Sequence, residues 1–207
     1  MRGIMGNECL NTASAMASPS KALWTIFILT INGRENYLQR LRGLLDPQLN
    51  HQVDVVVLKD NREHSIGEKR QYAVNNCTSK YINFIDDDDI IAGSYVDKIL
   101  HWMRRDAYGV GFRGIITMDG KIPVEFIHKA GLPYSEKPVR YDGAMRYTRP
   151  LNHLNPVMTS IAKEIGYKAI SMGEDRDYSI RLAESGLVQD DCLVNDYLYF
   201  YQYRSKK

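Results

Sequence analysis

The sequence predicts one α/β domain, in which a mostly parallel sheet flanked by helices is followed by a smaller, mixed or antiparallel second half. Apolar stretches rich in β-branched and aromatic residues alternate with helical patterns over the first half, as in parallel sheets with helical crossovers. Beyond residue 106 the stretches shorten, and a strong turn signal separates two of them. A chain of 207 residues that is 44% hydrophobic suits one core of this size.

The first predicted unit is a strand, a turn and a helix. Residues 23–31 (LWTIFILTI) form a near-continuous apolar run, as expected of a strand buried on both faces. Residues 32–34 interrupt the run, and apolar side chains then recur at helical spacing over 35–45. Because proline cannot continue a helix, this helix is expected to end before Pro47.

Two further pairs of strand and helix complete the predicted parallel sheet. Strands are predicted over 53–58 and 81–85, and helices over 66–76 and 95–103. The SYVD sequence has the form of a capping box, which predicts that Ser94 caps the last of these helices. Right-handed crossovers would then bring the carboxyl ends of the strands to one edge of the sheet.

Polar residues follow each of these strands, at 30–34, 59–61 and 86–89. Ligands of open α/β sheets bind at this edge. The last segment is four consecutive aspartates, and like charges about 5 Å apart cost about 3 kcal/mol per pair at the effective dielectric near a protein surface. Either the run is a solvated acidic turn that caps the next helix, or it binds a positive group.

The second half is predicted to begin with a hairpin or meander. Residues 109–118 and 124–128 have strand character, and Asp119-Gly120 marks the turn between them. Residues 131–155, which are rich in Gly, Pro, Tyr and Arg, are predicted to form a long functional loop. The remaining predicted elements are a helix over 159–165, a short strand over 169–171, a helix over 175–185 and a final strand over 196–204.

The final strand carries alternating tyrosines. Their period-2 spacing predicts that they share one face, and packing against the domain is favoured over stacking on a sugar or base. These residues are Tyr197, Tyr199, Tyr201 and Tyr203.

Composition narrows the function classes. The net charge of +2 gives no broad signature of nucleic-acid or anionic-membrane binding. The 3 cysteines are widely spaced, so neither a disulfide framework nor a zinc knuckle is indicated. No apolar run reaches the ~20 residues of a transmembrane helix, and residues 1–22 lack a signal-peptide core. We expect a cytoplasmic protein, of a bacterium or a phage-infected host, with a flexible tail over 1–22 and one domain over 23–207.

Four stretches, in this order, resemble the family 2 glycosyltransferases, which have the GT-A fold. They are TIFILTINGRENYLQRL, VDVVVLKDNREHSIGEKRQYAVNN, YINFIDDDDII and GEDRDYSIRLAESG, and the resemblance covers residues 24–186. It implies an inverting hexosyl- or pentosyltransferase that moves a sugar from a nucleotide diphosphate, with UDP favoured, to an acceptor hydroxyl. It also implies a nucleotide-sugar-binding half, residues 23–105, and an acceptor and catalytic half, residues 106–207.

The resemblance identifies the four aspartates with a DxD motif, which binds Mn²⁺ or Mg²⁺. Hard divalent cations prefer carboxylate oxygens and bridge the phosphates of the leaving group. Asp88 resembles the main metal ligand, while Asp86 would face the metal or the ribose. Asp87 and Asp89 would assist, and His153 is a further candidate ligand.

The resemblance places the nucleotide at the strand ends and on the second helix. Asp60 resembles the residue that accepts a hydrogen bond from a uracil-type base. Lys59 stands where a paired acid is usual, which leaves the base open. Lys69 and Arg70 are candidate partners for phosphate or for the aspartates, and an exposed helix face is the alternative. The nucleotide-binding set is Thr30, Asn32, Arg34, Asp60, Lys69, Arg70, Asp86 and Asp87.

The resemblance makes Asp175 the catalytic base. An inverting transfer needs a carboxylate that takes the proton of the attacking acceptor hydroxyl. Glu174 would orient the substrate or the acceptor. The alternative is an acidic helix N-terminus with no catalytic role, and Asp177 is interpreted as structural.

Two other function classes stay open. One is a non-catalytic transferase-like protein that binds nucleotides or carbohydrates, because the sequence shows carboxylates but not their geometry. The other is a sugar-nucleotide nucleotidyltransferase, although the LTINGREN stretch lacks the glycine-rich loop of that class.

The acceptor is not specified by the motifs. A glycan, a small molecule and a hydroxymethylated DNA base are the candidates. A local cluster of basic residues could contact DNA phosphates, and a solvated surface explains them too. They are Arg104, Arg105, Arg113, Arg140, Arg146, Arg149 and the residues of 204–207.

Overall fold

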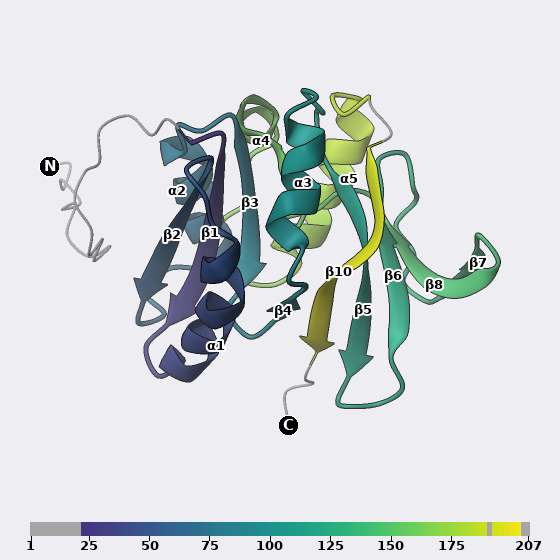
Figure 1. The fold of residues 1–207 in the computed structure, drawn as a ribbon, viewed down its shortest axis with the longest axis horizontal. Coiled ribbons are helices and arrows are strands. Elements are labelled where there is room, and N and C mark those ends of the chain that lie inside the picture. The colour runs from purple at the N-terminus through teal and green to yellow at the C-terminus, as the bar shows by residue number, and fades with distance from the viewer. Residues whose placement is uncertain (1–21, 190–191, 204–207) are drawn as a thin grey trace, which may run out of the picture.

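The computed structural model describes residues 22–189 and 192–203, so the predicted tail lies outside the described residues except for Ala22. The strands form two sheets that lie side by side (Figure 1), with the orders β2-β1-β3-β9 and β4-β10-β5-β6-β8-β7. The strands are β1 (Trp24–Ile31), β2 (Val53–Asp60), β3 (Tyr81–Asp86), β4 (Ile90–Ile91), β5 (Gly111–Met118), β6 (Val124–His128), β7 (Val139–Tyr141), β8 (Ala144–Arg149), β9 (Val157–Met158) and β10 (Leu193–Tyr203).

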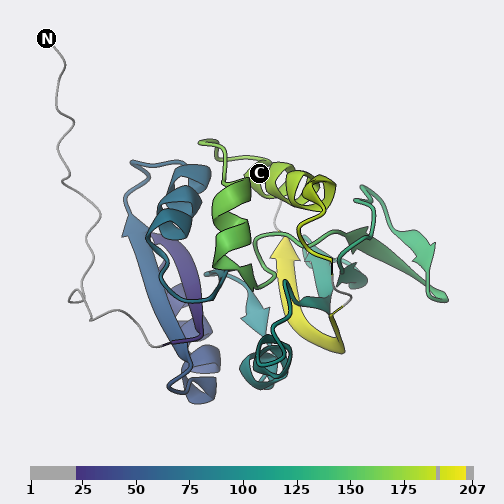
Figure 2. The same ribbon diagram turned by 90° about the horizontal axis from the view of Figure 1, so that it is seen from above.

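Helices cover both faces of these sheets. Figure 2 shows α1 and α3 on one side and α2, α4 and α5 on the other. Each side buries its own apolar cluster, which includes Leu41 and Ile99 on the first side and Val74, Ile161 and Leu182 on the second. The predicted α/β architecture is confirmed. The helices are α1 (Glu35–Leu45), the 3₁₀ turn η1 (Asp46–Gln48), α2 (Ile66–Asn76), α3 (Tyr95–Met103), α4 (Thr159–Ile165) and α5 (Glu174–Ser185).

Parallel pairing brings the predicted polar edge together. Strand β1 lies between β2 and β3 and runs parallel to both. Ile31 is opposite Asp60, and Leu29 is opposite Asp86, so both acids flank the end of β1. The carboxyl ends of the strands therefore form one edge, as the sequence predicts.

A buried asparagine links the core to the segment between β8 and β9. Asn83, on β3, accepts a hydrogen bond from Trp24 Nε1 at 2.8 Å. Its amide donates to Tyr95 Oη and to the Leu154 carbonyl, both at 2.9 Å. Because a buried amide without partners would be costly, these bonds fix how β3 meets the neighbouring elements.

The predicted cap of α3 is wrong. Ser94 occupies the N-cap position, but its side chain makes no capping hydrogen bond. The capping box belongs to α2 instead. There the Ser65 hydroxyl accepts from the Glu68 N–H at 3.2 Å, and the Glu68 carboxylate accepts from the Ser65 N–H at 2.7 Å.

Two predictions for the second half are also wrong. The region predicted as a long loop contains the β7–β8 hairpin, which turns at Asp142 and Gly143, both with positive φ. Strand β8 pairs parallel to β6, a long-range contact that local periodicity does not report. The short strand predicted over 169–171 is absent from the described structure, because the Ile170 carbonyl accepts from the Gly67 N–H at 2.9 Å instead of a strand partner.

The tyrosines of β10 do not share one face. Register shifts interrupt β10 on either side of Tyr197, so that Tyr197 is opposite Arg113 while Tyr199 is opposite Gly114. Tyr197 is exposed and hydrogen-bonds to Glu125, whereas Tyr199 is fully buried. The predicted packing of the strand against the domain holds for Tyr199.

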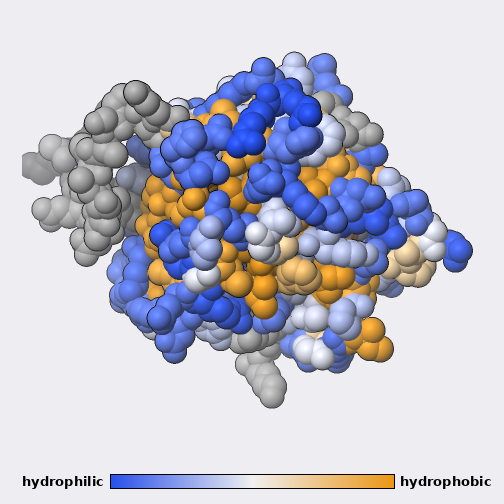
Figure 3. All heavy atoms as spheres, in the orientation of Figure 1, coloured by the Kyte–Doolittle hydropathy of each residue, from blue (hydrophilic) through white to orange (hydrophobic). Residues whose placement is uncertain are grey.

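The surface carries both hydrophilic and apolar residues. Figure 3 shows hydrophilic residues over much of the face seen in Figure 1, with apolar residues between them. Within the described ranges, no helix is both long and apolar enough to cross a membrane.

Candidate active site

A pocket of about 1070 Å³ lies at the carboxyl edge of the first sheet. One wall consists of the β1–α1 turn, the start of α2 and the four-aspartate turn. The other wall is a face of the second sheet, and the start of α5 completes the rim. Asn32 and Asp60 are not among the lining residues. The predicted residues that line the pocket are Thr30, Arg34, Lys69, Arg70, Asp86, Asp87, Asp88, His153, Glu174 and Asp175.

Asp86 is the last residue of β3. Its carboxylate accepts from Arg70 Nη2 at 3.2 Å and lies 3.4 Å from His153 Nε2. Burial would raise the pKa of Asp86, but His153 and Arg70 together hold it well below its ordinary value. Asp86 is therefore an ionised carboxylate whose two oxygens already have partners.

Asp87 is fixed by the β1–α1 turn. Thr30 Oγ1 donates to Asp87 Oδ2 at 2.5 Å, and Arg34 donates from Nε and Nη2 at 2.5 to 3.0 Å. A bidentate guanidinium–carboxylate pair fixes both orientation and distance. Thr30, Arg34 and Asp87 thus join the ends of β1 and β3.

Asp88 keeps more of its surface open to the pocket. Its side chain is 30% exposed, against 4% for Asp87. Arg34 Nη2 lies 2.9 Å from Asp88 Oδ2, and Arg40 donates to the Asp88 carbonyl. Arg34 therefore neutralises part of the charge of two adjacent aspartates.

Asp89 points into the protein and is fully buried. Tyr199 Oη donates to its Oδ2 at 2.7 Å, and the Gln202 N–H donates to its Oδ1 at 3.2 Å. Burial, with the nearby charge of Asp86, raises the pKa of Asp89 well above its ordinary value. Repulsion within the four aspartates is thus relieved by cationic partners and by a shift of Asp89 towards its neutral form.

Arg70 joins the two predicted acidic motifs. Its Nη1 lies 2.5 Å from Glu174 Oε1, while Nη2 contacts Asp86, and its side chain is only 3% exposed. Burial would lower the pKa of Arg70, but the surrounding acids raise it overall. The start of α5 is therefore tied to the end of β3 by one buried charge.

Asp60 faces inward, beneath the loop that precedes α2. Lys69 Nζ donates to its Oδ1 at 2.7 Å, and the N–H groups of Arg62 and His64 donate at 3.4 and 3.1 Å. Burial would raise the pKa of Asp60, but Lys69 and these amides lower it. Asp60 and Lys69 form a buried ion pair that shapes the loop.

Asp175 has a different environment from its neighbours on α5. Asp175 lines the pocket and is partly exposed, and its side chain makes no hydrogen bond or ion pair with another described residue. Asp177 instead pairs with Lys168 and, at 2.7 Å, with Arg181, in agreement with a structural role. Gly173 precedes the helix with φ of 79°, a conformation that favours glycine.

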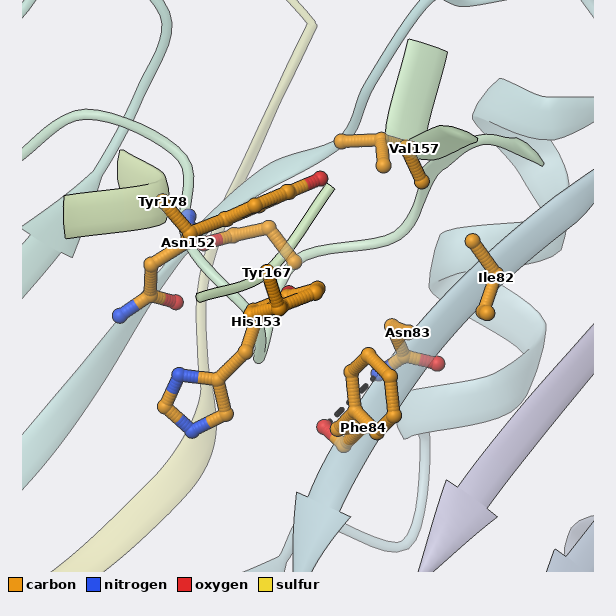
Figure 4. A pocket seen from close by; sticks show the side chains of 10 residues that line it. Ile82, Asn83, Phe84, Asn152, His153, Val157, Tyr167 and Tyr178 are labelled. Carbon is orange, nitrogen blue, oxygen red and sulfur yellow. Dashed lines mark hydrogen bonds between the residues drawn. The ribbon is translucent and has the colours of Figure 1, made fainter. Parts of the chain in front are cut away.

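The two histidines of the second half lie in different settings. His128 Nδ1 is 2.9 Å from Asn155 Oδ1, and burial lowers the pKa of His128 to about 3, so the ring is neutral. His153 contacts Asp86 through Nε2, while its Nδ1 is buried without a partner among the described residues. Figure 4 shows His153 beside a closely packed interior space lined by Phe84, Tyr167 and other residues.

The acids fit a cation that arrives with phosphates better than a preformed metal centre. Among the described residues, no group of three or more His, Cys, Asp or Glu side chains is placed to hold an ion. Magnesium bound to a nucleotide commonly uses one or two carboxylates together with phosphate oxygens and water. Asp88 and Asp86, at the pocket surface, suit that mode of binding.

Sequence reasoning missed Tyr134 and Tyr147 on the aromatic wall of the pocket, and for Tyr201 it favoured packing over stacking on a sugar or base. Tyr134, Tyr147 and Arg149 line the pocket from the region predicted as a loop, and Tyr201 lines it from β10. The alternation of Tyr147 and Arg149 within β8 was the available signal, since residues two apart on a strand face the same side.

Comparison with known proteins identifies the family. The glycosyl transferase family 2 profile matches residues 8–156. Crystal structures of S. aureus TarS 1–349, alone and with UDP-GlcNAc or UDP, superpose with a TM-score of 0.56 at 13% or 14% identity, over 86% or 89% of this chain. The chain spans about 60% of the length of these structures. No curated protein sequence matches. At this identity the likeness shows the GT-A fold, and the profile match shows that the chain belongs to glycosyl transferase family 2.

Proposed function

We propose that this glycosyltransferase moves a sugar from a nucleotide diphosphate, with UDP favoured, to an acceptor hydroxyl with inversion. One observation carries the proposal: a single pocket holds the acids at the end of β3 and an unpaired acid at the start of α5. Structures of TarS with UDP and UDP-GlcNAc support a UDP-sugar as the donor. The assignment of nucleotide binding to residues 23–105 and of acceptor binding to residues 106–207 is part of the proposal.

The donor would lie on the wall formed by the first sheet. Asp88 and Asp86, with His153 in contact with Asp86, would hold Mn²⁺ or Mg²⁺, and the cation would supply positive charge to the leaving diphosphate. Arg34 orients Asp87 and Asp88 for this task. The remaining donor-side residues would be Thr30, Asn32, Asp60, Lys69 and Arg70, with Asp60 and Lys69 shaping the loop on the base side.

Asp175 is proposed as the general base. The acceptor oxygen forms a bond to the anomeric carbon, the bond from that carbon to the diphosphate oxygen breaks, and Asp175 takes the acceptor proton. A single displacement of this kind inverts the anomeric centre. Glu174, which Arg70 holds at 2.5 Å, would act by orientation.

Calorimetric titration tests the donor assignment. UDP, GDP, CDP and dTDP are titrated with and without Mn²⁺ into the wild type and into Asp88→Asn. Asp177→Asn is a matched control, because that acid pairs with Lys168 and Arg181 and does not line the pocket. We expect metal-dependent binding of one nucleotide that only Asp88→Asn abolishes.

The alternatives give different results in the same experiment. Folded protein that binds no nucleotide in any condition would overturn the proposal. Binding without turnover of any nucleotide sugar would support the non-catalytic protein instead. The acceptor classes and the cytoplasmic location stay predictions from the sequence.

A further inference from the structure

We propose that the second-sheet wall of the pocket binds an acceptor sugar that carries a phosphate or carboxylate group. Arg149 would bind the anionic group, between Tyr134 and Tyr147. The inference rests on the proposed function, since it names the class of acceptor for the same pocket.

Arg149 is a buried charge without a counter-ion. It ends β8, is half-buried, and forms no ion pair with any carboxylate of the described residues. Its Nη1 donates only to neutral oxygens, the Thr148 carbonyl at 3.0 Å and Ser135 Oγ at 3.2 Å. Burial lowers the pKa of Arg149, as expected of a guanidinium that has lost water without gaining a carboxylate.

The opposite wall is different in this respect. Each lining cation there that belongs to the predicted donor site contacts a carboxylate within 3.2 Å. These cations are Arg34, Lys69 and Arg70. An arginine that faces the same pocket without such a partner is available to an anionic ligand.

Aromatic rings hold the Arg149 guanidinium in place. Its Cζ lies 3.9 Å from the centre of the Tyr134 ring and 5.1 Å from that of Tyr147. Cation–π contacts of this kind fix the plane of the guanidinium before a ligand arrives. A fixed arginine fork matches the oxygens of a phosphate or carboxylate.

The side chains around Arg149 suit a sugar ring. Tyr147 is opposite Phe126, and Arg149 is opposite His128, so that all four side chains project from the same face of the sheet into the pocket. His128 is neutral, which leaves Arg149 as the charge of this aromatic face. Aromatic rings with a few placed polar groups are typical of small-molecule sites.

Asp175 provides the link to the reaction. It lines the same pocket as Arg149, without an ion pair between them. An acceptor anchored by its anionic group at Arg149 would therefore share the pocket with the proposed base. The pocket volume of about 1070 Å³ lies at the upper end of the range of roughly 300–1,000 Å³ for ligand sites, which leaves room for an acceptor beside the donor.

The test uses three probes with a common ring. Methyl glucoside, glucuronic acid and glucose 6-phosphate are titrated calorimetrically into the protein, both saturated with UDP and Mn²⁺ and without them. We expect the phosphate or carboxylate probe to bind about tenfold more tightly than the neutral one, which corresponds to about 1.4 kcal/mol. The two charged probes distinguish a sugar phosphate from a sugar acid.

Arg149→Gln should remove this preference and change the affinity for UDP by less than about twofold. Arg149→Lys keeps the charge but loses the fork, so an intermediate preference is expected. The control is Arg176→Gln. Arg176 also stacks on Tyr134, at 5.0 Å, but it pairs with Glu136 and does not line the pocket.

Three outcomes overturn the inference. In the first, the neutral probe binds as tightly as both charged ones. In the second, Arg149→Gln weakens UDP as much as the charged probe, which assigns Arg149 to the donor. In the third, Arg176→Gln has the same effect as Arg149→Gln. Loss of nucleotide binding in the wild type is a failure of the proposed function, and the titrations without UDP still decide whether Arg149 binds the anion.

Discussion

The two walls of the pocket handle charge in opposite ways. On the first-sheet wall, Arg34, Lys69 and Arg70 all contact aspartates, and Arg70 also holds Glu174. On the second-sheet wall, Arg149 is held by aromatic rings instead of acids. The difference shows that Arg34, Lys69 and Arg70 are held by acids of the fold, so that each cation depends on its carboxylate partners. The second-sheet wall keeps its charge available.

The largest expected effect is on catalysis and concerns the acid between the walls. Asp175→Asn preserves shape but removes the base, so transfer to the acceptor should fall by about 100- to 10,000-fold. Nucleotide affinity should be unchanged, since Asp175 forms no ion pair with the donor-side residues described. Initial rates and UDP titrations measure both quantities. Asp177→Asn should leave the rate near that of the wild type, and equal losses in both variants would contradict the assignment.

The next-largest effect is on the free energy of unfolding, and it compares the loss of one arginine from each wall. Arg70→Met removes the buried partner of Glu174 and leaves Asp86 with His153 alone, so the free energy of unfolding should fall by about 3–5 kcal/mol. Arg149→Met removes cation–π contacts and hydrogen bonds to neutral oxygens but breaks no ion pair, so it should cost about 1–2 kcal/mol. Urea denaturation of both variants gives the two values. Similar losses would break the comparison.

As the pH falls, protein stability should decrease through His128, on the second-sheet wall, before it decreases through Asp60. The pKa of His128 is lowered from 6.5 to about 3 in the fold, so the unfolded chain binds a proton first. Its contribution to stability is present above pH 6.5 and is lost as the pH falls towards 3, by up to about 1.4 kcal/mol per pH unit. The lowered pKa of Asp60 has the same sign, but it acts only below the ordinary value of 3.8.

Urea denaturation of the wild type and of His128→Gln between pH 6.5 and 4.5 isolates the histidine, because the raised pKa of Asp89, which acts in the opposite direction, is common to both proteins. His128→Gln should have a shallower dependence of stability on pH than the wild type over this window. An unchanged slope would show that His128 does not carry the effect.

The smallest effect concerns the anchor of the aspartate turn. Tyr199→Phe removes the hydroxyl that bonds Asp89 at 2.7 Å, while the Gln202 N–H remains, so a loss of about 1 kcal/mol is expected. Tyr197→Phe is the control on the same strand, because Tyr197 is exposed on the other face. Thermal unfolding of both variants, with wild type, tests the difference.

Sequence reasoning succeeded where structure is local. Each of the first strands is an apolar run followed at once by its helix, so the elements and the polar edge at Asp60 and Asp86 could be predicted. The distinct partners of the aspartates could not, because those partners lie as far away as Tyr199. Repulsion in the run indicated that some relief was needed, but not that Asp89 would be buried for it.

In the second half, long-range strand pairing decides more of the structure than local sequence does. Strand β8 owes its position to parallel pairing with β6, and its sequence, AMRYTR, has little apolar character. The register shifts around Tyr197 likewise depend on the partner strand β5. Arg149 could be recognised only as one of several basic residues until β8 placed it between two tyrosines.

The contacts of Asp89 also set an order of events during synthesis. Its carboxylate receives Tyr199 and Gln202, and Gln202 lies 113 positions later in the chain. Strands β1, β2 and β3 can pair while the ribosome is still translating the second half. Asp89, however, has neither of these partners until β10 has left the exit tunnel, whereas Thr30 and Arg34 can already hold Asp87. A nascent chain can therefore form its first sheet before the aspartate turn has all of its contacts.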